Sequence, residues 1–196
     1  MKKTLSILII LLICSCAKRS YKIIDYGQFK ITVPEKWNKY ERKGIDSYIG
    51  GIITDKNDTL KFDLGKYSAD VSTDLPMIYT KEMLSELAKK ERELLPKTKH
   101  LVVEDWTYEG IDIKEYLKYD VEYYTIDCIN AKIITPKNKG FGSSGIYIDS
   151  LSGLKQNYDK LKFNFYGQYL SDKTQAEFIK ALKTLRFEKY CGQHRI

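Results

Sequence analysis

Residues 29–34, Phe29-Lys30-Ile31-Thr32-Val33-Pro34, carry the clearest strand pattern of the chain. Apolar side chains alternate with the polar Lys30 and Thr32, which is the period of a strand with one face buried and the other in solvent. Pro34 ends the pattern because proline has no N–H to donate to a sheet. We therefore expect a half-buried β-strand at this place.

Apolar and alternating segments predict further strands through most of the chain. They lie at residues 48–54, 59–64, 101–106, 111–117, 119–134, 145–151, 160–166 and 184–187. The sequence Asp55-Lys56-Asn57-Asp58 predicts a hairpin turn between the first two. In the segment 119–134 the alternation loses its phase at Cys128-Ile129, so we expect a β-bulge or an exchange of faces there.

Two segments have the spacing of amphipathic helices. Residues 80–95 carry an apolar stripe and are followed by Pro96. Residues 174–182 have Thr174 and Glu177 at the spacing of a capping box. The order of elements predicts an α+β fold with a central, largely antiparallel β-sheet flanked by helices. No repeat or linker divides residues 21–190, which we expect to form one domain, and residues 191–196 form a C-terminal tail.

Three features resemble the PsbP-like family. They are residues 31–37 (ITVPEKW), a hairpin through Gly50-Gly51, and a C-terminal amphipathic helix that runs into residues 183–187 (KTLRF). The family includes a photosystem II extrinsic subunit, a Ran-binding nuclear-import factor and many bacterial lipoproteins. The resemblance covers roughly residues 21–187. It implies an α/β/α sandwich, with helices on both faces of the sheet, and no catalytic residues.

The N-terminus is typical of a bacterial secretory signal. Residues 1–16, MKKTLSILIILLICSC, place two lysines before a short apolar run and end on two cysteines. The run is about half of the roughly 20 residues that a membrane-spanning helix needs. Lipoprotein signals resemble one another in having an aliphatic residue three positions before the cysteine and a small residue just before it. Cys16 has Ile13 and Ser15 there, whereas Cys14 would follow the bulky Ile13. We expect residues 1–15 to be a signal peptide and Cys16 to be lipidated.

Lipidation of Cys16 would set where the protein acts. Two or more acyl chains anchor a protein stably to a membrane. Residues 16–20 would then be a lipidated N-terminus and a short tether, with a reach of at most roughly 18 Å. We expect a protein of the cell envelope, anchored to a bacterial membrane on its periplasmic side, whose partner is another envelope protein or a polymer that lies on the membrane surface.

The charge of the chain is modestly basic. It has 33 basic and 26 acidic residues, and without Lys2 and Lys3 of the signal the net charge falls from +7 to +5. No block of Lys and Arg with interleaved aromatic residues indicates a nucleic-acid partner. Lys18, Arg19 and Lys22 adjoin the lipidated cysteine, where we expect them to meet anionic headgroups.

Two cysteines remain beyond the signal, Cys128 and Cys191. In an oxidising compartment they could form a disulfide, which the chain-entropy model values at about 4 kcal/mol for a loop of this length. The alternative is a buried Cys128 on a strand and a free Cys191 thiol in the tail. The sequence leaves both open.

Aromatic residues give the best candidate for a partner surface. The chain has 16 tyrosines, and tyrosine is enriched both in strands and at interfaces. The candidate surface is one group close together in sequence, on the hypothesis that the sheet exposes its members on one side: Trp106, Tyr108, Tyr116, Tyr119, Tyr123 and Tyr124.

No motif predicts catalysis, a metal or a cofactor. Residues 140–145 spell G-x-G-x-x-G, but a strand rather than a helix follows them, which favours a hairpin loop. The two histidines, His100 and His194, are far apart, and no C-x-x-C or H-x-x-x-H spacing occurs. Our hypothesis is a non-catalytic binding or assembly module for an envelope protein. The alternative is a lipoprotein that binds a small ligand or a glycan through an aromatic-rich sheet surface.

Overall fold

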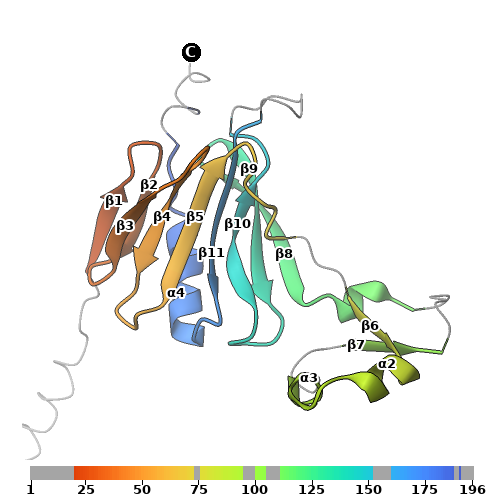
Figure 1. The fold of residues 1–196 in the computed structure, drawn as a ribbon. Coiled ribbons are helices and arrows are strands. Elements are labelled where there is room, and N and C mark those ends of the chain that lie inside the picture. The colour runs from red at the N-terminus through yellow and green to blue at the C-terminus, as the bar shows by residue number, and fades with distance from the viewer. Residues whose placement is uncertain are drawn as a thin grey trace, which may run out of the picture.

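The computed structural model describes residues 20–72, 76–94, 100–104, 111–151, 160–187 and 190. Its main element is a seven-stranded antiparallel sheet with strand order β3-β4-β5-β11-β10-β9-β8 (Figure 1). The strands are β3 (Asn38–Lys43), β4 (Tyr48–Ile53), β5 (Thr59–Gly65), β8 (Tyr119–Ile126), β9 (Ile129–Pro136), β10 (Ser143–Ile148) and β11 (Lys162–Gln168). The prediction of a mostly antiparallel sheet is therefore confirmed, and helices are few.

One face of this sheet, the inner face, carries the hydrophobic core. Helix α4 (Asp172–Leu182) and a hairpin of β1 (Tyr21–Asp25) and β2 (Lys30–Pro34) lie on it. The ring of Phe29 lies 5.0 Å from those of Phe62 and Phe163, centre to centre. Phe165 lies 5.3 Å from Phe178 of α4. Residues 29–34 thus bury one face, as their alternation predicts.

The outer face of the sheet is crossed by residues 66–72, named the strap below. Ser68 Oγ donates to the carbonyl of Asp63 on β5 at 3.1 Å, and Asn164 Nδ2 on β11 donates to the carbonyl of Ala69 at 2.9 Å. After the strap the chain enters a lobe on the β8 side of the sheet (Figure 1). The lobe contains β6 (Met77–Thr80), α2 (Lys81–Glu86), α3 (Lys89–Leu94) and β7 (His100–Val103).

The long strand predicted over residues 119–134 is wrong, because β8 and β9 form a hairpin. Their register pairs Ile126 with Ile129, which leaves Asp127 and Cys128 as the turn. Asp127 has φ 59°, a left-handed conformation that Asp adopts more readily than most residues. The loss of alternation at residues 128–129 marks this turn rather than a bulge.

The segments 111–117 and 80–95 also differ from expectation. Residues 111–117 contain the 3-10 helix η2 (Ile113–Tyr116), not a strand, because the side chain of Asp112 accepts the N–H of Lys114 at 3.0 Å and caps the turn. The single helix predicted over residues 80–95 is wrong: α2 and α3 are two separate short helices, because Leu87 between them leaves the helical conformation, with ψ 137°. The guanidinium of Arg92 donates to the Leu87 carbonyl at 2.9 Å and stabilises this break.

The last helix begins earlier than its sequence indicates. Ser171 is the N-cap of α4, and its side chain accepts the N–H of Thr174 at 3.2 Å. The predicted capping box of Thr174 and Glu177 is therefore wrong. Glu177 is buried and accepts a hydrogen bond from the Tyr21 hydroxyl at 3.2 Å instead.

Candidate functional sites

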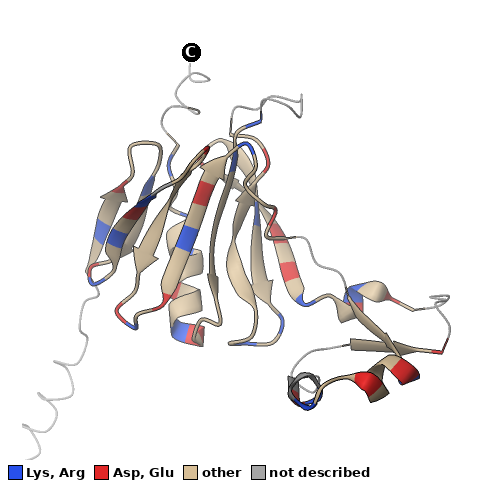
Figure 2. Cartoon of the chain, viewed as in Figure 1, with Lys and Arg blue, Asp and Glu red and all other residues tan. Residues whose placement is uncertain are grey.

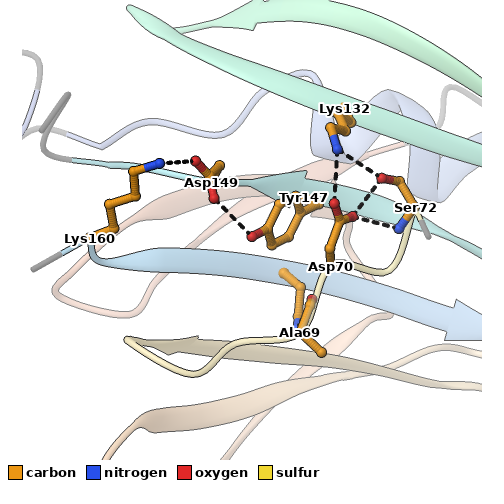
Figure 3. A network of polar contacts seen from close by, with 8 residues as sticks. Ala69, Asp70, Ser72, Lys132, Tyr147, Asp149 and Lys160 are labelled. Carbon is orange, nitrogen blue, oxygen red and sulfur yellow. Dashed lines mark hydrogen bonds and ion pairs between the residues drawn. The ribbon is translucent and has the colours of Figure 1, made fainter. Parts of the chain in front are cut away.

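A cluster of polar side chains joins the strap to the outer face of the sheet (Figure 3). Lys132 Nζ on β9 lies 2.8 Å from Asp70 Oδ2 and 3.2 Å from Ser72 Oγ. The hydroxyl of Tyr147 on β10 donates to Asp149 at 3.2 Å. We name this cluster the polar clasp, and its members are Asp70, Ser72, Lys132, Tyr147, Asp149 and Lys160.

The polar clasp holds its charged groups as ion pairs. Burial alone would raise the pKa of Asp70, but hydrogen bonds, led by that from Lys132, outweigh it and lower the pKa. Lys160, 2.6 Å away, lowers the pKa of Asp149. Burial raises the pKa of the Tyr147 phenol well above its ordinary value. Neither a paired ammonium nor a neutral phenol is in the form of a base or a good nucleophile. The contacts of the polar clasp attach the strap to the sheet.

The structure divides the predicted aromatic partner surface between the two faces of the sheet. Tyr123 is on the outer face and 77% exposed, and Tyr119 on the same face accepts the N–H of Ser143 at 3.4 Å. Tyr124 packs against the core on the inner face, with Lys183 Nζ 4.2 Å from its ring centre. The remaining members are Tyr116, half-buried in η2, and Trp106 and Tyr108, which lie outside the described residues.

Strand β8 is an edge of the sheet, and within the described ranges it pairs only with β9. Residues 120–123 are all exposed, and the strand runs for eight residues without a proline. Val121 and Tyr123 lie on the outer face, whereas the acidic Asp120 and Glu122, red in Figure 2, lie on the other. An edge strand presents a row of N–H and C=O groups that point away from its sheet. Here the edge runs for eight residues, and residues 120–123 along it are exposed.

A shallow hollow of about 260 Å³ lies at one end of β5 and β11. Tyr169 on its rim is 63% exposed and has φ 55°. Its N–H donates to the carbonyl of Gly142 at 2.8 Å, and its ring lies 5.8 Å from that of Phe141. Tyr169 is thus an exposed aromatic side chain on a fixed backbone. The other lining residues are Asp58, Thr59, Lys61, Tyr166, Gly167 and Gln168.

A second hollow, of about 410 Å³, lies where the chain enters the domain. Its rim includes Ser20, the β2–β3 turn, the β4–β5 turn and the first turn of α4. The indole Nε1 of the buried Trp37 donates to Asp55 Oδ1 at 3.1 Å. This hydrogen bond joins the β2–β3 turn to the β4–β5 turn. We name this the tether-end hollow.

Cys128 is exposed in the β8–β9 turn and is disulfide-bonded. A buried, free Cys128 is therefore excluded. Its partner lies outside the described residues, as do Cys191 and the predicted lipidation site Cys16. Pairing of Cys128 with Cys191 stays a prediction.

Among the residues that the structure describes, no group of three or more His, Cys, Asp or Glu side chains is placed to hold a metal ion. Gly140 and Gly142 lie between β9 and β10 with φ 72° and 117°, and Gly145 lies within β10. The G-x-G-x-x-G sequence thus leads into a strand, as expected. No helix of the described part is long and apolar enough to cross a membrane.

Sequence comparison adds no relative: no family model and no curated protein matches the chain.

Proposed function

We propose that the protein is a lipid-anchored binding or assembly module of the bacterial cell envelope. It is tethered through Cys16 to a membrane, on the periplasmic side, and holds an envelope protein close to that membrane. The function is non-catalytic. The observation that carries the proposal is the long, exposed edge strand β8.

Strand β8 fits the addition of one strand from a partner protein. Main-chain hydrogen bonds along the edge supply affinity in this mode, and alternate side chains supply specificity. The outer face of β8 offers Val121 and Tyr123 to apolar side chains of the partner. Asp120 and Glu122 on the inner side favour basic side chains there. The partner segment is thus an extended strand that alternates apolar and basic residues.

The opposite edge of the sheet is less suited to this task. Strand β3 has six residues, and their sequence NKYERK contains four charged side chains. Lys39 and Glu41 are already paired with each other at 2.6 Å. Charges along an edge oppose the addition of another strand, and β3 has four charged side chains in six residues, against two in the eight residues of β8. We therefore assign the partner to β8 alone.

The proposal extends to the fold family. The antiparallel sheet, the hairpin through Gly50-Gly51 and the helix α4 before residues 183–187 support membership of the PsbP-like family. Helices on both faces of the sheet, the sandwich of that family, remain part of this proposal. The helix that packs on the sheet within the described ranges is α4, on the inner face.

Crosslinking in intact native cells tests the function. Tagged wild-type protein is compared with Cys16→Ala, and captured proteins are identified by mass spectrometry. A specific envelope protein captured only by the anchored form supports the proposal. Capture of abundant neighbours alone, or the same captured protein for both forms, contradicts it.

The second candidate function is binding of a small ligand or a glycan. The fixed and exposed Tyr169 beside the 260 Å³ hollow favours it, because aromatic rings with a polar tip suit such ligands. Thermal-shift screening of envelope glycans identifies a ligand, since a concentration of 100 Kd stabilises the folded state by about 2.7 kcal/mol. Tyr169→Ala should abolish that shift, and Tyr67→Ala, at a tyrosine 81% exposed elsewhere, should retain it.

A further inference from the structure

We infer that the tether-end hollow faces the membrane and that Lys36, Lys56 and Lys173 on its rim bind the phosphate groups of phospholipid headgroups. The inference rests on the lipid anchor of the proposed function. It adds an orientation of the domain and a second, non-covalent contact with the membrane.

The first argument is the short path from the lipid to the rim. Ser20 lies on the rim, and its carbonyl accepts the N–H of Glu35 at 3.0 Å, which fixes this residue to the β2–β3 turn. Ser20 is four residues from Cys16. A fully extended chain spans at most about 3.6 Å per residue, so the lipid-bearing cysteine lies within roughly 14 Å of Ser20. The anchor therefore holds this end of the domain close to the membrane.

The second argument is the charge on the rim. Lys36 lies in the β2–β3 turn, Lys56 in the β4–β5 turn and Lys173 in the first turn of α4, and all three are exposed. None of them forms an ion pair with another described residue. Three ammonium groups from three separate elements thus surround one concave surface. Lysine ammonium groups close to a membrane are attracted to its anionic headgroups.

The acidic residues of the same rim weaken this attraction only in part. The carboxylate of Asp55 is occupied by the Trp37 indole, and that of Glu177 is buried under the Tyr21 hydroxyl. Glu35 and Asp55 are exposed and repel phosphate. The lining has three carboxylates and three lysines, but Glu177 is buried, so the exposed charges of the rim are three lysines against two carboxylates.

This orientation of the domain also determines how strand β8, the edge assigned to the partner, lies relative to the membrane. The N–H of Ser143 donates to the hydroxyl of Tyr119, the first residue of β8, and Ser143 pairs with Gln168 of β11. Gln168 is close in sequence to the start of α4, and the first turn of α4 lines the hollow. Strand β8 therefore begins near the membrane at Tyr119 and runs away from it to Ile126. A partner strand added there would extend outward from the membrane surface.

Fluorescence quenching of Trp37 tests the inference. The full-length lipidated protein, in a Trp106→Phe background, is placed in vesicles of phosphatidylethanolamine and phosphatidylglycerol with a nitroxide-labelled headgroup lipid. The expected result is strong quenching of Trp37, most of which is lost in Lys36→Glu/Lys173→Glu and partly lost in Lys36→Gln/Lys173→Gln. The matched control Lys180→Glu/Arg186→Glu, at the other end of α4, has the same change in charge and should keep the quenching.

Two outcomes overturn the inference. They are equal quenching in the rim variant and the control variant, and absence of quenching in the parent protein although the anchor is present. The mass of the lipid adduct on Cys16, measured in each sample, separates these failures from failure of the proposed function. A missing adduct contradicts the anchor itself, and the inference falls with it. Thermal melting of each variant confirms that it is folded.

Discussion

Lys132 on β9 and Asp70 in the strap form an ion pair, with 2.8 Å between Nζ and Oδ2 and side chains only 32% and 22% exposed. Figure 3 shows this pair between the strap and β9. Together with the hydrogen bond from Asn164 to Ala69, it fixes the strap on the outer face. These contacts hold the strap, which precedes the lobe in the chain, against the sheet.

Loss of this ion pair should destabilise the protein. In Lys132→Met the carboxylate of Asp70 stays partly buried without its ammonium, and we expect the free energy of unfolding to fall by about 1–3 kcal/mol. Lys81→Met removes a pair with the same distance, to Glu104, but with side chains 70% and 84% exposed. This control should cost much less than Lys132→Met, because solvent screens the charges of an exposed pair. Urea unfolding measures both, and equal costs would contradict the role of the polar clasp.

The stability of the protein should decrease in acid. The pKa values of Asp70 and Asp149 are lower in the folded state than the ordinary value of 3.8. Each carboxylate therefore stabilises the folded state above that value, and this contribution is lost as the pH falls through the lower folded pKa. Urea unfolding from about pH 6 down to about pH 3 should show the decrease. In Lys132→Met the decrease should be shallower, and an unchanged slope would argue against the pairing.

Cys128 should be joined to Cys191. The N–H of Phe187 donates to Asp127 Oδ2 at 2.9 Å, and this bond holds the end of the described chain next to the β8–β9 turn. Peptide mapping without reduction should find one linked pair of peptides with these two cysteines. Cys191→Ser should lower the free energy of unfolding by about 2–4 kcal/mol, and Cys128→Ser by the same amount. Free alkylation of Cys191 in the native, unreduced protein would refute the pairing.

The turn residue Asp127 should tolerate only certain substitutions. Its φ of 59° suits Gly or Asn, and its carboxylate accepts the Phe187 N–H. Asp127→Asn should have little effect, and Asp127→Gly should cost about 1 kcal/mol through the lost hydrogen bond. Asp127→Ala should cost about 2–3 kcal/mol because it adds backbone strain. Thermal or urea unfolding measures the order of stability of the three variants. If Asp127→Ala is more stable than Asp127→Gly, the backbone of this turn is not strained.

Much of the sheet follows from local pattern. Alternation over residues 29–34 and 59–64 identifies strands because their apolar side chains meet one core face. Where the pattern misled, a single polar side chain decides the structure. Asp127 turns an apparent sixteen-residue strand into a hairpin, and Asp112 caps a helical turn in place of a strand. Asp127 and Asp112 determine the local backbone conformation, and hydrophobic periodicity contains no information about that conformation.

The candidate surfaces were less predictable than the fold. Clustering in sequence puts Tyr123 and Tyr124 together, yet adjacent strand residues face opposite sides of a sheet. The polar clasp joins Asp70 and Lys132, which are 62 positions apart. Both hollows depend on turns that meet only in three dimensions. A signal for β8 does exist, in its mixture of acidic and aromatic residues, but whether a strand lies at an edge is set by topology.

Site-specific photocrosslinking at Tyr123 tests the central claim, that β8 receives the envelope partner, most directly. A photoreactive phenylalanine analogue replaces Tyr123 in the lipid-anchored protein, in intact cells. The same analogue at Tyr67, which is 81% exposed against 77% for Tyr123, serves as the control. The account predicts one specific envelope protein crosslinked at Tyr123 and not at Tyr67. Equal crosslinking at both positions, or crosslinking at Tyr67 alone, would contradict it.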